Sequence, residues 1–182
     1  MAQMAFYFNM NDCTGCKCCE VACKDKNELP IGTFFRRTTD YEGGLFPAVW
    51  SATLTNGCNQ CDNPACVAAC PVGAIVKESK YGAVVQDHEA CIGCQACVEA
   101  CPYGQPVYFA DEGKTRKCDS CIQWLENGMQ PACVGACSTR ALKWGPVEEM
   151  AAMPGATRDI PVLPSSELTG PNAFIFPKPE MA

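Results

Sequence analysis

Seventeen cysteines constrain this chain more than any other feature, because sixteen of them fall into four tight groups. Each group begins with C-x2-C and ends with C-x3-C, and only the middle gap varies. The groups, in chain order, are Cys13, Cys16, Cys19 and Cys23; Cys58, Cys61, Cys66 and Cys70; Cys91, Cys94, Cys97 and Cys101; and Cys118, Cys121, Cys133 and Cys137. This internal repeat indicates duplication of one thiol-bearing unit.

The spacing is typical of cubane [4Fe–4S] clusters, each of which needs four thiolates at the corners of a tetrahedron. A C-x2-C-x2-C loop supplies three of them, and the cysteine that follows after three residues ligates the other cluster of a pair. Cys70-Pro71 and Cys101-Pro102 match the C-P end of the bacterial ferredoxin pattern. Groups two and three are therefore expected to form a two-cluster ferredoxin, which leaves groups one and four to form a second ferredoxin-like half.

Zinc and disulfide bonds are the alternative uses of so many cysteines. Structural zinc usually takes two separated C-x2-C pairs, and groups two and four contain such pairs, but zinc leaves the repeated C-x3-C unexplained. A disulfide framework usually belongs to a much shorter chain, and an odd count of 17 leaves one thiol unpaired. We therefore favour four [4Fe–4S] clusters.

The sequence also allows predictions about three features near the cysteine groups. Cys18 lies outside the spacing rule, and only Cys19 preserves both the x2 and the x3 gaps, so we expect Cys18 to be a free thiol. His88, the single histidine, is expected on a surface turn rather than as a metal ligand. Arg116-Lys117 directly precedes Cys118. A cation there would raise the potential of a nearby cluster by stabilising its reduced form, or else it is simply solvated, and both alternatives stay open.

Short elements between the cysteine groups predict an α+β fold. Alternating and β-branched segments indicate strands at 5–8, 33–41 and 48–55, and a small hairpin over 73–85 with its turn at Tyr81-Gly82. Short helices are expected at 20–26, 64–69, 95–100, 122–127, 131–136 and 148–153.

The grouping of the cysteines predicts three parts of the chain. Residues 1–56 and 104–145 would form the half with groups one and four, and residues 57–103 would form the inserted half with groups two and three. Residues 146–182 hold seven of the 14 prolines. The apolar Phe174-Ile175-Phe176 in this segment favours an extended arm that docks on a partner over a disordered tail.

Charge and motifs exclude several classes of function. The net charge is −6 and the basic runs are short, whereas nucleic-acid binding needs a basic stripe. Apolar runs do not approach the roughly 20 residues of a membrane span, and residues 1–10 lack the features of a signal peptide. The chain shows neither a Walker-type loop nor a dinucleotide fingerprint nor a Ser-His-Asp set. We therefore expect it to move electrons rather than to catalyse a reaction.

Seven segments carry a family resemblance over nearly the whole chain, namely 12–26, 34–38, 57–76, 90–107, 116–122, 132–143 and 170–180. Together they resemble the four-cluster iron–sulfur electron-transfer subunits of the molybdopterin oxidoreductase (dimethyl sulfoxide reductase) family, most closely the iron–sulfur subunit of dimethyl sulfoxide reductase. These motifs are specific for the family and much less so for a substrate.

The resemblance implies four [4Fe–4S] clusters whose ligand sets cross between groups. The implied sets are Cys13, Cys16, Cys19 and Cys137; Cys118, Cys121, Cys133 and Cys23; Cys58, Cys61, Cys66 and Cys101; and Cys91, Cys94, Cys97 and Cys70.

The resemblance also implies a place in a larger complex of anaerobic respiration. The chain would relay electrons between a donor, either a quinol-oxidising membrane subunit or a soluble donor, and a molybdenum or tungsten bis-pterin catalytic subunit. The half with groups one and four would face the catalytic subunit. The complex would lie at the membrane, on its outer face if a signal-bearing partner exports the chain, or in the cytoplasm. The alternatives are the similar subunit of a formate dehydrogenase or hydrogenase, a free-standing polyferredoxin and a zinc-dependent interaction module.

Overall fold

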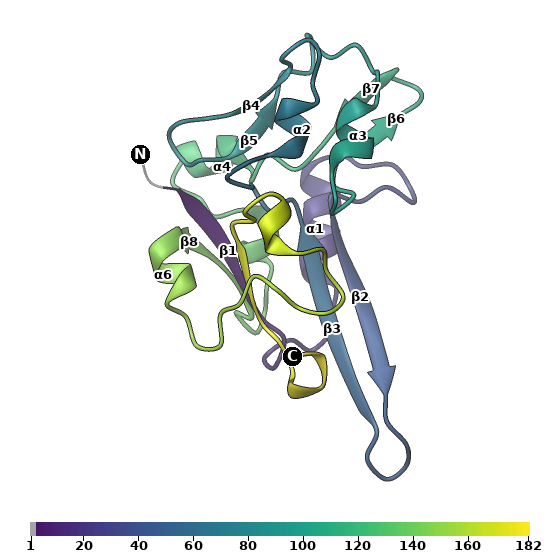
Figure 1. Ribbon diagram of the computed structural model, residues 1–182, viewed down its shortest axis with the longest axis vertical. Coiled ribbons are helices and arrows are strands. Elements are labelled where there is room, and N and C mark those ends of the chain that lie inside the picture. The colour runs from purple at the N-terminus through teal and green to yellow at the C-terminus, as the bar shows by residue number, and fades with distance from the viewer. Residues whose placement is uncertain (1–2) are drawn as a thin grey trace.

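The computed structural model describes residues 3–182 and has the expected α+β architecture, built around a three-stranded sheet (Figure 1). The central strand β1 (Met4–Asn9) pairs antiparallel with β8 (Leu142–Pro146) and parallel with β9 (Ala173–Phe176). Successive side chains of a strand point to opposite faces. In β1, Phe6 and Phe8 therefore enter the main hydrophobic core, whereas Ala5 and Tyr7 enter a second, smaller one.

A long hairpin of β2 (Arg36–Gly43) and β3 (Trp50–Gly57) projects from the body of the molecule (Figure 1). The two expected strands are confirmed, but both lie two to three residues further along the chain. The base of the hairpin contributes Ala52 and Leu54 to the main core, whereas Leu45 and Phe46 at its tip are 86% and 91% exposed.

Two small hairpins lie at the other end of the molecule (Figure 1). The pair β4 (Ile75–Lys77) and β5 (Val84–Gln86) confirms the hairpin expected from the sequence. The pair β6 (Val107–Phe109) and β7 (Lys114–Arg116) was not expected. Each strand has only three residues, which is too short for a clear period-two pattern.

Short helices lie close to the positions expected from the sequence, and four of them overlap the C-x3-C segments that end the cysteine groups. The helices are α1 (Cys18–Lys26), α2 (Ala65–Ala68), α3 (Ala96–Ala100), α4 (Ile122–Glu126), α5 (Ala132–Gly135) and α6 (Val147–Ala151), with 3₁₀ turns at Ser166–Leu168 and Pro179–Met181. Helix α1 packs on α5, and α2 packs on α3. The first pair joins cysteine groups one and four, and the second joins groups two and three. Within residues 3–182, no helix combines the length and the apolarity that a membrane crossing requires.

The C-terminal segment differs from the arm that the prolines predicted. Its apolar stretch is β9, which lies beside β1 inside the body of this chain, and Phe174 and Ile175 are buried there. Asn172, just before β9, is fully buried and donates hydrogen bonds to the carbonyl of Gln60 (3.0 Å) and to Asp62 Oδ1 (2.8 Å). The segment thus orders against its own chain, and its role in partner docking stays a prediction.

Ile175→Ala tests whether β9 is integral to the core. Ile175 is 6% exposed, and removing a buried isoleucine side chain costs roughly 2–5 kcal/mol. We expect a clearly lower midpoint of anaerobic thermal unfolding, followed by circular dichroism. Val162→Ala is the matched control, because Val162 is 41% exposed. Equal melting of the two variants would contradict an integral β9.

Candidate iron–sulfur cluster sites

The structure brings cysteines of different groups together: two cavities are each lined by four thiols from two groups, and the remaining eight patterned cysteines, from groups one and four, act on one another and are assigned to two further sets. Cys58, Cys61, Cys66 and Cys101 line one cavity, called site 2. Cys70, Cys91, Cys94 and Cys97 line another, called site 3. We assign Cys13, Cys16, Cys19 and Cys137 to site 1, because the charges of the other three act on Cys13. We assign Cys23, Cys118, Cys121 and Cys133 to site 4, because charges act among these thiols, although Cys58 of site 2 acts on Cys118 as well.

Burial raises the pKa of eight of the sixteen thiols. Burial, with a smaller contribution from neighbouring thiolates, raises the pKa of Cys23 and Cys66 to about 12 and the pKa of Cys61 to about 11. Burial also acts on Cys91, but hydrogen bonds from Thr115 and from backbone amides outweigh it and lower the pKa of that thiol. Buried thiols of this kind ionise when a metal takes the place of the proton.

The four C-x2-C loops share one backbone geometry. The residue just before the second cysteine is left-handed in every loop, with φ of 68° at Gly15, 49° at Gln60, 71° at Gly93 and 61° at Ser120. This bend turns amides toward sulfur: the N–H groups of Gly15 and Ser120 each donate to the first cysteine of their loop, at 3.4 Å. Successive amides that face one way form an anion-binding concavity.

The helix starts divide the groups into two kinds. In groups one and three, the left-handed residues Lys17 and Gln95 precede α1 and α3. In groups two and four, prolines precede α2 and α5, in the matching segments 64–66 and 131–133, which both read Pro-Ala-Cys. Each packed helix pair thus combines one start of each kind, which supports duplication of a whole two-site unit.

Side chains outside the motifs complete the surroundings of the sulfur atoms. Buried Thr55 lies 3.4 Å from Cys19 Sγ in site 1, and Thr169 donates to Cys61 Sγ at 3.2 Å in site 2. Thr115 Oγ1 lies 3.5 Å from both Cys91 and Cys97 in site 3. Thr169 is far from any cysteine motif, whereas Thr55 and Thr115 each lie three residues before the first cysteine of a group, Cys58 and Cys118, a shared spacing that sequence reasoning missed.

Two cations also lie among the sites. Arg36 is 5% exposed, and its Nη1 donates to Thr55 Oγ1 at 3.3 Å. Lys117 is 7% exposed, and its Nζ donates to the carbonyls of Val84 and of Cys118. The sequence left open whether Lys117 is solvated, and the structure buries it. Arg116 remains half-buried and pairs with Glu112 at 3.3 Å.

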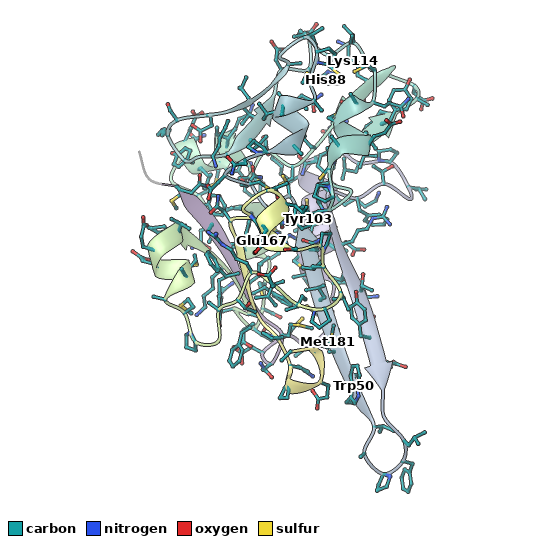
Figure 2. The ribbon with its side chains drawn as sticks, viewed as in Figure 1. Trp50, His88, Tyr103, Lys114, Glu167 and Met181 are labelled. Atoms are coloured by element: carbon teal, nitrogen blue, oxygen red, sulfur yellow. The ribbon has the colours of Figure 1, made fainter. Side chains whose placement is uncertain are left out.

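Cys18 and His88 lie outside the four sets. Cys18 is the exposed first residue of α1, and its Sγ faces the carbonyl of Cys16 at 3.8 Å. His88 lies on the surface, where its Nε2 is 3.0 Å from Glu112 and its carbonyl accepts a hydrogen bond from Lys114 at 2.7 Å (Figure 2). Its expected surface position is therefore confirmed.

The donor sets fit iron–sulfur clusters. Every patterned donor is a thiol, the soft ligand that such clusters take, and apolar residues such as Pro64 and Val84 line the same cavity as the thiols of site 2. Within residues 3–182, no three side chains of His, Cys, Asp or Glu lie close enough together to bind one single metal ion. The ligands of a cubane are spread more widely, because each binds a different iron. Hydroxyl and amide groups directed at sulfur are the kind of hydrogen bonding that such clusters receive.

Comparison with known proteins agrees with these sites. A family model described as a 4Fe-4S dicluster domain matches residues 49–147. The probable anaerobic dimethyl sulfoxide reductase chain YnfG of Escherichia coli (strain K12) is 43% identical, over 96% of this chain and 89% of that protein. One chain of the anaerobic dimethyl sulfoxide reductase of Haemophilus influenzae is 39% identical, over 97% and 90%. One subunit of the tetrathionate reductase of Salmonella typhimurium is 36% identical, over 93% and 70%.

The fold and the thiol sites define an iron–sulfur protein of the ferredoxin-like, dicluster class. Within that class, this protein belongs to the family of iron–sulfur electron-transfer subunits that includes the matching chains of the anaerobic dimethyl sulfoxide reductases. The family and the iron–sulfur cofactors expected from the sequence are thereby confirmed.

Gly93→Ala tests the geometry of the loop at site 3. A left-handed alanine costs roughly 1–2 kcal/mol, and a Cβ at Gly93 would also collide with the carbonyl oxygen of Gly113. Gly73→Ala is the control, because it has a similar φ, near the same site, and open space around its Cβ position. We expect Gly93→Ala to lose its absorbance near 400 nm at a lower temperature than Gly73→Ala. Equal loss in both variants would show that the close approach of Gly113 has no effect.

Proposed function

We propose that this chain carries four [4Fe–4S] clusters, one at each of sites 1 to 4, and conducts electrons to or from a molybdenum or tungsten bis-pterin catalytic subunit. The observation that carries the proposal is the crossing of the thiol sets. In each half, the last cysteine of one group belongs to the site of the other group, so the sites of a half cannot form independently.

Helix packing, one hydrogen bond to sulfur and charge interactions between thiols of different sites support a single continuous row. Site 3 adjoins site 2 through the packed helices α2 and α3. Site 2 adjoins site 4, because Gln60 Nε2 lies 3.9 Å from Cys118 Sγ and the charge of Cys58 acts on Cys118. Site 4 adjoins site 1, because the charge of Cys133 acts on Cys19. The order along the row is therefore 3, 2, 4, 1.

The residues of the chain have three tasks in this row. The sixteen thiolates hold the irons, and the buried threonines and loop amides direct hydrogen bonds at sulfur. The hydrophobic clusters that include Cys23, Cys66, Cys97 and Cys133 exclude water from the gaps between sites. Each cluster, when bound, stores and releases one electron.

The relatives support the choice of partner. Their names describe components of reductases for dimethyl sulfoxide and for tetrathionate. This chain would likewise serve a catalytic subunit that determines the substrate, with site 1 nearest to that subunit and site 3 nearest to the electron donor. The donor would be a quinol-oxidising membrane subunit or a soluble carrier, and the complex would lie at the membrane, on the outer face through export with a signal-bearing partner.

Iron counting with two cysteine variants tests the four-cluster assignment. The complex, purified without air, should hold about 16 irons per copy of this chain, four for each cluster, besides those of the partner. Cys97→Ser should lower this number, because Cys97 is a thiol of site 3. Cys18→Ser should leave it unchanged, because Cys18 is exposed and outside every set.

Two results would contradict the assignment. One is an iron content near eight per chain with full electron-transfer activity, which would leave two sites without clusters. The other is an equal loss of iron from Cys18→Ser and Cys97→Ser, which would place Cys18 among the ligands.

A further inference from the structure

Two charged side chains are buried within residues 3–182, and both lie at junctions between thiol sites. They are Arg36 and Lys117, at 5% and 7% exposure. In the part of the chain that the structure describes, neither has a carboxylate within 4.0 Å. An unpaired charge in the interior is strongly unfavourable unless an opposite charge lies nearby. Their position therefore requires negative groups close to them.

Arg36 lies between sites 1 and 4. Its guanidinium donates to Thr55 Oγ1 at 3.3 Å, and the same oxygen lies 3.4 Å from Cys19 Sγ of site 1. The ring of Phe6 covers the guanidinium at 5.0 Å. Burial lowers the pKa of Arg36, but the thiolates of site 4, led by Cys133, and of Cys19 outweigh burial and raise it. The cation thus lies one hydroxyl away from the sulfur of Cys19 in site 1, and the charges of the site 4 thiols act on it.

Lys117 lies between sites 2 and 4. It lines the cavity of site 2 beside Cys58 and Cys66, and its Nζ donates to the carbonyl of Cys118 at 2.6 Å. Burial raises the pKa of both Cys66 and Cys118, and the charge of Lys117 opposes that rise at each of them. The cation therefore acts on one thiol of each site.

The physical consequence of a buried cation is a change in potential. Reduction adds one negative charge to a cluster, so a nearby positive charge stabilises the reduced form and raises the reduction potential. The interaction falls with distance and is least screened where water is excluded. Each cation therefore acts mainly on the two sites that it separates.

We propose that Arg36 raises the reduction potentials at sites 1 and 4 and that Lys117 raises those at sites 2 and 4. The potential of site 4 is then raised by both cations, and the potential of site 3 by neither. This inference rests on the proposed function, because it assumes a cluster at each site. Under this proposal, two residues outside the cysteine motifs determine the relative reduction potentials of the clusters along the row.

The test is a redox titration of the purified complex, followed by electron paramagnetic resonance, with neutral and charge-conserving variants. In Arg36→Met, two midpoints should shift to lower potential and two should stay. At a fixed potential, the ratio of reduced to oxidised cluster at the affected sites should fall about tenfold, which is about 59 mV for a one-electron couple. In Lys117→Met, two midpoints should shift likewise, and one of them should be a midpoint that Arg36→Met also shifts. The double variant should shift that shared midpoint furthest.

Two control variants distinguish an effect of the removed charge from an effect of a changed structure. Arg36→Lys should keep the midpoints near those of the native complex, because it keeps the charge. Arg37→Met should leave all four unchanged, because Arg37 is an exposed cation on the same strand. Iron content is measured for every variant. If Arg36→Met loses iron, Arg36→Gln and Lys117→Met carry the same test.

Three results would overturn the inference. They are unchanged midpoints in both neutral variants, an equal shift of all four midpoints, or a shift in Arg36→Lys as large as in Arg36→Met. A native complex with far fewer than about 16 irons per chain would instead refute the proposed function. The two failures are therefore distinguishable.

Discussion

The crossing of thiols between cysteine groups is the constraint on which the rest of the structure depends. Helices α2, α3 and α5 have only four or five residues, far fewer than an isolated helix needs in water. They are held by the packing of α1 on α5 and of α2 on α3. The hydrophobic clusters at these contacts include cysteines, namely Cys23 with Cys133 in one and Cys66 with Cys97 in the other. We therefore expect cofactor binding and folding to be coupled in this chain.

The segments without cysteines have the complementary task of closing the sites. The C-terminal segment contributes Thr169 to the sulfur of Cys61, and Asn172 holds the loop of site 2 through Gln60 and Asp62. The β2–β3 hairpin contributes Thr55 and Arg36 to site 1. In the region drawn near the centre of Figure 2, Tyr103 lies close to the C-terminal segment, and it also lines the cavity of site 2. Residues from distant parts of the chain thus meet around each set of thiols.

Local signals explain what the sequence could predict. The C-x2-C loops and the helices after them are determined within a few residues, so their places followed from spacing alone, and the hairpin β4–β5 followed from its turn at Tyr81-Gly82. The pairing of β1 with β9 joins residues more than 160 positions apart, and no local pattern specifies it. For the same reason, the sequence suggested an arm at 146–182 instead of a strand in the central sheet. Arg36 lies in the segment 34–38 that carries the resemblance, and Thr115 lies three residues before Cys118, but neither position shows which sulfur the side chain will face. The division at residues 56 and 103 stays a prediction.

Anomalous X-ray scattering from iron, recorded on crystals of the anaerobically prepared complex, tests the central claim most directly. The account predicts four compact iron peaks in this chain, arranged in the order 3, 2, 4, 1, each surrounded by the four cysteines of its crossed set. Peaks bound by the cysteines of a single sequence group, or a zinc edge in place of the iron edge at any site, would contradict it.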